Sequence, residues 1–111
     1  MQPELALPEL ERVRARIAPW IVETPSRRWE GGALAARLGA GTEVEVKLEL
    51  FQRTGTFKAR GAINTMLSLE PAQRARGVTA VSAGNHAVAT AWAAQQLGIH
   101  ARSEEHTSEL Q

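Results

Sequence analysis

The sequence contains no cysteine and no aspartate. Without cysteine the chain has neither disulfides nor thiolate metal ligands, and we expect no metal site. No apolar run reaches the length of a membrane span, and the N-terminal residues, which include Glu4, lack the apolar core of a secretory signal. We therefore expect a cytoplasmic protein that has no membrane partner.

Charge excludes another class of partner. The formal net charge is +1, with 13 basic and 12 acidic residues, so nothing indicates binding to nucleic acid or to an anionic membrane. Lysine is scarce, with Lys47 and Lys58 as its two instances. The total of 111 residues allows one small domain with a modest core.

The first half of the chain carries two helix signals and one strand signal. Pro8 can open a helix at its first turn, and Pro19 ends it. A short helix is expected over residues 33–38. Apolar and charged residues alternate over 44–50, which predicts a half-buried strand with Lys47 on its solvent side.

The second half predicts three helices and two strands. Thr56 is a suitable N-cap for a helix that runs to about residue 69. A short helix over 71–77 precedes an apolar strand at 78–81, a helix at 86–97 and a further strand that begins near 99–101. Alternating strands and helices predict an α/β architecture with parallel strands flanked by helices.

Lys58 occupies an unusual place in this pattern. It lies in the first turn of the predicted helix, where a positive charge opposes the helix dipole. The same field, together with partial burial beside Phe57, favours the neutral amine, which can form a Schiff base with an aldehyde. The alternative is an ordinary solvated lysine without a chemical role.

The turn after the strand at 78–81 is a second candidate site. A strand, a turn of small residues and a helix together direct backbone N–H groups at an anion. Ser82 adds a hydroxyl, Gly84 allows close approach, and Asn85 offers an amide donor and acceptor at the carboxyl edge of the sheet. The alternative is a plain connection in which Asn85 caps the helix.

Together the two segments resemble a known family. Thr-Gly-Thr-Phe-Lys-Ala-Arg-Gly-Ala at 54–62 and Ser-Ala-Gly-Asn-His-Ala at 82–87 are similar to the signature segments of fold type II pyridoxal-phosphate enzymes. The nearest branch is the threonine/serine dehydratases (threonine ammonia-lyases), and serine racemases are near relatives. Thr24-Pro25 and residues 47–53 fit the same branch in the same order, so the resemblance runs from about residue 10 to residue 101.

The resemblance implies a domain organisation. Residues 1–77 would form the N-terminal part of the large cofactor-binding domain, and residues 78–101 would start the small domain of a two-domain fold. The family's glycine-rich phosphate loop and the partner of its pyridine nitrogen would lie downstream. The chain would then be a truncated start of a homo-oligomeric enzyme, and we expect it to be poorly stable and inactive on its own.

The resemblance also implies roles for individual residues. Lys58 would hold pyridoxal 5′-phosphate through a Schiff base and then remove the substrate's α-proton. Phe57 would pack near the cofactor, and Asn85 would hydrogen-bond its 3′-oxygen. The substrate carboxylate would be received by the turn formed by Ser82, Ala83, Gly84, Asn85 and His86.

The implied activity is that of an ammonia-lyase that converts a small hydroxy amino acid, L-threonine or L-serine, to a 2-oxo acid and ammonia. Racemases of this group need a serine at the place of Ala83 as a proton carrier, so alanine favours elimination. Val88 departs from the glutamine common in the dehydratases. A racemase-like or other fold type II enzyme, and a non-catalytic anion-binding module, remain alternatives.

The last ten residues, 102–111, read differently from the rest. They show neither strand alternation nor a buried face, and they resemble the in-frame translation of a sequencing-library adapter. We interpret them as an artefact and exclude them from the fold. Glu104, Glu105 and His106 then do not form a metal site.

Overall fold

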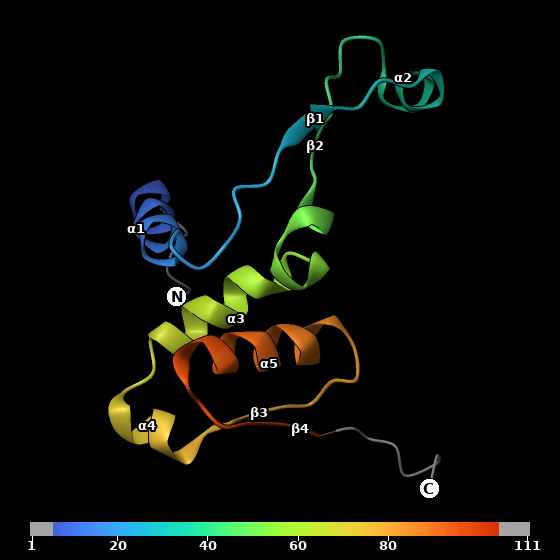
Figure 1. Cartoon of the computed structure of the whole chain (residues 1–111). Helices are drawn as coiled ribbons and strands as arrows, with labels where there is room; N and C mark the ends of the chain where they lie inside the picture. The colour runs from blue at the N-terminus through green and yellow to red at the C-terminus, as the bar shows by residue number, and fades with distance from the viewer. Residues whose placement is uncertain (1–5, 105–111) are drawn as a thin grey trace, which may run out of the picture.

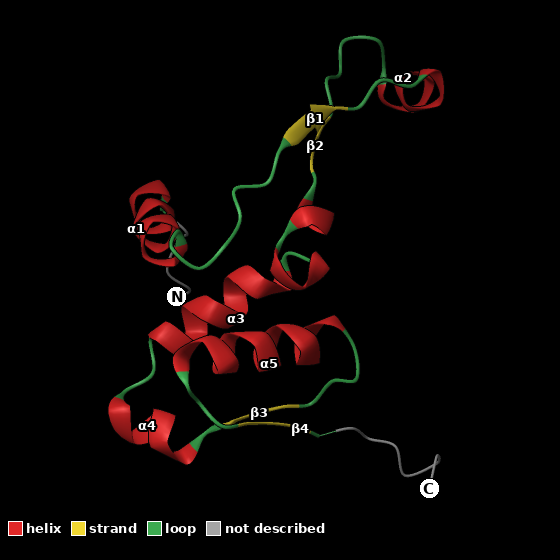
Figure 2. Cartoon of the chain, in the orientation of Figure 1, coloured by secondary structure: helices red, strands yellow, loops and turns green. Residues whose placement is uncertain are grey.

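The computed structural model describes residues 6–104. Helices and short strands alternate along the chain, as predicted for the α/β class (Figures 1 and 2). The elements are α1 (Leu7–Ile17), β1 (Ser26–Arg28), α2 (Gly32–Leu38), β2 (Glu45–Lys47), the 3-10 turns η1 (Glu49–Phe51) and η2 (Arg53–Gly55), α3 (Lys58–Leu67), α4 (Pro71–Arg76), β3 (Val78–Ala80), α5 (Asn85–Leu97) and β4 (Ala101–Ser103).

The core lies where α3 packs along α5, with β3 and β4 on the other side of α5 (Figure 1). Alanine at positions 59, 89 and 93 is fully buried, which lets the two helices approach closely. Ile63 is the one large side chain that is completely buried among the described residues. Six buried residues form the central cluster: Ile17, Ile63, Met66, Ala93, Ala94 and Ile99.

Strands β3 and β4 are parallel, as predicted. The strand β4 begins at Ala101 and includes Arg102 and Ser103, which pair with Thr79 and Ala80. The exclusion of these two residues from the fold was therefore wrong. Their backbone groups complete a ladder with β3 whatever their side chains are. Glu104 follows the strand, and its N–H donates to the Ala80 carbonyl oxygen at 2.7 Å. Residues 105–111 of the supposed adapter segment lie outside the described residues.

The hairpin of β1 and β2 differs from the prediction. The two strands are antiparallel, and β2 is shorter than the strand expected over 44–50. The chain leaves the extended conformation at Leu48 and enters η1, so Leu50 is 63% exposed and does not face a core. Lys47 is exposed, as expected, and its Nζ donates a hydrogen bond to the Thr24 carbonyl oxygen at 2.9 Å.

The start of α3 also departs from the prediction. The helix begins at Lys58, and Thr56 does not cap it, because Thr56 is extended and Phe57 occupies the N-cap position without a side-chain bond. The chain reaches this point through Thr54 at φ 66° and Gly55 at φ 81°. After this pair of residues with positive φ, the helix begins one residue later than expected.

No helix within residues 6–104 is long and apolar enough to cross a membrane. No group of three or more potential metal-ligating side chains comes together in the same part of the chain.

Candidate cofactor and substrate site

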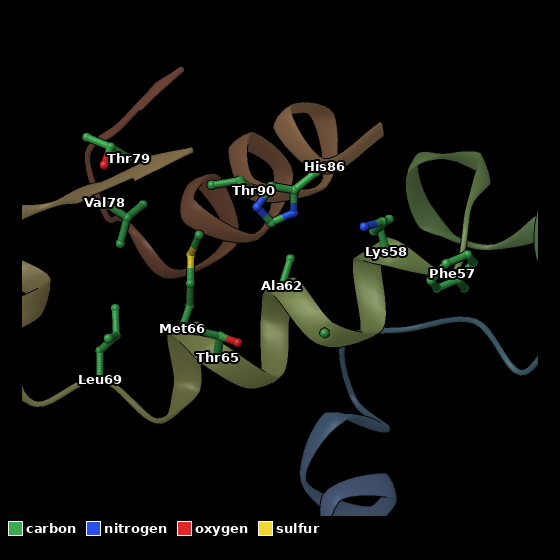
Figure 3. A pocket seen from close by; sticks show the side chains of 11 residues that line it. Phe57, Lys58, Ala62, Thr65, Met66, Leu69, Val78, Thr79, His86 and Thr90 are labelled. Atoms are coloured by element: carbon green, nitrogen blue, oxygen red, sulfur yellow. The ribbon is translucent and has the colours of Figure 1, made fainter. Parts of the chain in front are cut away.

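A cavity of about 430 Å³ lies between α3 and α5. Its volume falls in the range of pockets that hold small molecules. Figure 3 shows that side chains from both helices and from β3 surround it. Lys58 and Ala62 come from α3, and His86 and Thr90 from α5. The cavity therefore joins the two segments that the sequence analysis singled out.

Lys58 is the first residue of α3 and is exposed. Its Nζ lies 5.9 Å from the centroid of the Phe57 ring, within cation–π range. Phe57 is itself 62% exposed, and Lys58 is exposed beside it. The expected partial burial of Lys58 is therefore wrong. The amine is accessible to a ligand that enters the cavity.

His86 and Thr90 form the wall contributed by α5. In Figure 3 the imidazole of His86 reaches from α5 toward α3. Thr90 is 6% exposed and lines the same cavity. Sequence reasoning missed Thr90, although its position one helical turn after His86 places it on the same face of α5.

The turn before α5 does not line the Lys58 cavity. Ser82, Ala83, Gly84 and Asn85 are absent from its walls, whereas His86 is part of them. The Gly84 N–H donates to Ser82 Oγ at 3.1 Å. Asn85 is the first helical residue and makes no side-chain cap. An anion at this turn would therefore compete with Ser82 for the Gly84 N–H.

A polar network under the start of α3 was also missed by sequence reasoning. The Glu49 carboxylate forms an ion pair with Arg60 and accepts a hydrogen bond from Thr24 Oγ1 at 2.6 Å. The pKa of Glu49 is lowered to about 2. The largest cause is the hydrogen bond from Arg60, burial acts in the opposite direction, and the Thr24 hydroxyl, the charge of Arg60 and the Gln52 side chain add to the lowering. The partners are far apart in sequence, so no local motif reveals them.

An α/β chain with an accessible amine beside a ligand-sized cavity defines a candidate cofactor-dependent enzyme. The family described as pyridoxal-phosphate dependent enzyme matches residues 17–103, and the chain belongs to that family. The resemblance inferred from the two signature segments is confirmed, together with the fold type II architecture and pyridoxal 5′-phosphate as the cofactor of the family.

Individual relatives support the assignment. The chain is 48% identical over 99 residues to phenylserine dehydratase of Ralstonia pickettii, covering 86% of this chain and 29% of that protein. It is 52% identical over 61 residues to L-threonine ammonia-lyase of Thermotoga maritima, covering 55% and 15%. The structure of maize serine racemase matches with a TM-score of 0.73 and 36% identity, covering 89% of this chain and 29% of that one. The chain thus spans less than a third of the length of these proteins.

The residues around the cavity fit one part of the cofactor. The exposed Lys58 amine suits the aldehyde group, and Ala62 and Met66 offer apolar walls to an aromatic ring. Among the described residues, Lys58 and His86 are the lysine, arginine or histidine side chains that line the cavity. No glycine-rich loop is among these lining residues. The fit therefore concerns the reacting end of the cofactor rather than its phosphate.

Proposed function

We propose that this chain is part of a pyridoxal-phosphate-dependent ammonia-lyase that acts on L-threonine or L-serine and releases a 2-oxo acid and ammonia. The observation that carries the proposal is the exposed Lys58 amine at the cavity between α3 and α5. The names of two similar proteins, a phenylserine dehydratase and an L-threonine ammonia-lyase, support this reaction class.

Lys58 has two tasks in this proposal. Its Nζ would hold the cofactor and, once the substrate has displaced it, would take the proton from the substrate's α-carbon. When bound, the cofactor supplies the sink for the electrons left on that carbon. Phe57 would pack beside the cofactor, and Asn85 would donate a hydrogen bond to its 3′-oxygen. Both assignments extend the family resemblance.

The substrate carboxylate would bind at the turn from Ser82 to His86. The position of this turn before α5 supports the assignment, because the N-terminal end of a helix favours an anion. Ala83 is exposed within the turn and carries only a methyl group. It cannot return a proton to the opposite face of the substrate, which supports elimination over racemisation.

The proposal also covers the whole protein. We propose that it is a cytoplasmic homo-oligomer, with residues 1–77 in the large domain and residues 78–101 at the start of the small domain. We also propose an adapter origin for residues 102–111. We further propose that the 111-residue chain is inactive. The short span relative to similar proteins and the lack of a phosphate loop among the described lining residues support this.

Reductive trapping tests the role of Lys58. The chain is incubated with pyridoxal 5′-phosphate and reduced with borohydride, and the modified lysine is identified by peptide mass spectrometry. We expect modification at Lys58 that is lost in Lys58→Ala and kept in the matched control Lys47→Ala. In the whole protein, Lys58→Ala should lower 2-oxo acid formation by at least about 10²–10⁴-fold, the usual contribution of a general base. Equal modification of both lysines in the wild type would contradict the assignment.

A further inference from the structure

The turn that leads into α3 is strained. Thr54 has φ 66° and ψ 0°, and Gly55 follows with φ 81°. A β-branched residue with positive φ is an outlier that persists only where neighbouring contacts hold it. Thr54 lies four residues before Lys58, so the conformation of this turn determines where α3 begins.

Gln52 holds one side of the turn. It is 4% exposed, and its side chain forms three hydrogen bonds with backbone groups. Gln52 Nε2 donates to the Val22 carbonyl oxygen at 2.8 Å, while Oε1 accepts from the N–H groups of Val22 and Arg53 at 2.9 Å each. These bonds fasten the turn to the extended segment that follows α1.

Glu49 and Arg60 hold the other side. Their side chains are only 16% and 28% exposed, respectively. Arg60 lies in the first turn of α3, two residues after Lys58, and its guanidinium binds Glu49 with both Nε and Nη2. The second oxygen of Glu49 also accepts from Thr24 Oγ1. One carboxylate therefore ties η1, the extended segment and the start of α3 together.

We propose that Glu49, Arg60 and Gln52 are positioning residues for Lys58, which hold the strained turn so that the amine stays at the cavity. This inference rests on the proposed role of Lys58. None of the three lines the cavity between α3 and α5, so they act through the backbone of the turn and of the first helical residues. The ion pair keeps its charges at neutral pH, because the pKa of Glu49 is about 2.

The rate of reductive trapping at Lys58 provides the test. Glu49→Gln should lower this rate and the ratio of Lys58 to Lys47 modification about tenfold, in line with the large effect of small misplacements on reaction rates. The matched control is Glu43→Gln, which removes an ion pair with Arg28 whose side chains are 75% and 52% exposed. The control should react like the wild type.

Two further variants separate positioning from folding. Glycine adopts the positive φ of residue 54 without strain, so Thr54→Gly should react at the wild-type rate. Combined with Glu49→Gln, it should recover part of the lost Lys58 rate while the helical circular dichroism is unchanged. The charge-exchanged double variant Glu49→Arg/Arg60→Glu should recover part of the lost rate. In urea all variants should react at the rate of the unfolded wild type.

The possible outcomes are distinct. If the wild type shows no preference for Lys58, the proposed function fails. If the wild type prefers Lys58 but Glu49→Gln reacts at the wild-type rate with unchanged helical circular dichroism, the positioning inference is overturned and the role of Lys58 stands. If Glu49→Gln does not fold, the milder variant Arg60→Lys, which keeps the charge but loses the two-nitrogen contact with Glu49, decides between these results.

Discussion

At the scale of single residues, Glu49 shows how one carboxylate can serve three segments. Its oxygens bind the guanidinium of Arg60 and the hydroxyl of Thr24. Its negative charge is therefore paired inside the fold rather than exposed to solvent. Breaking such a mostly buried pair is more harmful than losing an exposed one, because the remaining charge is left without a partner.

The pH dependence of stability should reveal this pair. The pKa of Glu49 falls from 4.5 to about 2 on folding, so its contribution is complete above pH 4.5 and is lost as the pH falls toward 2. At pH 7 the contribution is on the order of 3 kcal/mol. Urea unfolding of the wild type and Glu49→Gln, followed by helical circular dichroism, should show a difference that shrinks below pH 4.5. The same difference at pH 2 and pH 7 would contradict this account.

The residues of the site differ in how far the sequence could reveal them. The place of Lys58 at the start of a helix was predictable from the local pattern, whereas its proposed role depends on the family resemblance. The pairing of Glu49 with Thr24 and Arg60 depends on how distant segments pack, and no spacing rule encodes it. The exposure of Phe57 was unpredictable for the same reason, since burial depends on neighbours that sequence alone does not place.

At the scale of elements, helices were more predictable than strands. Proline and glycine act locally, and they fixed the ends of α1 and α4 near the expected positions. Alternation indicates a strand only where one face is buried. The exposed strand β1 and the polar end of β4 lack that pattern, and their pairing is a property of the backbone.

The junction of α4 and β3 should be sensitive to a single methyl group. Gly77 has φ 84°, and a Cβ there would lie 2.7 Å from the His100 carbonyl oxygen. That oxygen accepts from the Val78 N–H at 2.9 Å and joins the segment before β4 to β3. Gly77→Ala should destabilise the chain by about 1–3 kcal/mol.

Thermal or urea unfolding checks this prediction. The matched control is Gly32→Ala at the start of α2, where nothing lies within 4 Å of the added carbon and φ is not positive. The control should change stability by less than about 0.5 kcal/mol or raise it slightly. Equal effects of the two substitutions would show that the β3–β4 junction is not constrained as the structure indicates.

At the scale of the whole molecule, the described chain has two unequal parts. Helices α1, α3 and α5 with β3 and β4 share the core cluster, whereas β1, β2 and α2 extend away from it (Figure 1). Several large apolar side chains remain exposed: Leu7, Leu10, Trp29, Leu38, Leu50, Phe51, Phe57, Val81 and Val88. Burial of apolar area is the main source of stability. Because these side chains stay exposed, we expect residues 6–104 to gain little stability from apolar burial.

The two parts should therefore unfold separately. Amides in the hairpin, such as the Trp29 N–H that donates to Val44 O, have few packed neighbours and should exchange with solvent by local opening. Amides in α3 and α5 near Ile63 should exchange more slowly, because they open only when the core does. Native-state hydrogen exchange should separate the two groups by at least about tenfold. A single sharp transition with equal protection in hairpin and core would show that the 111-residue chain is one cooperative unit, and it would also contradict the low stability expected from its exposed apolar surface.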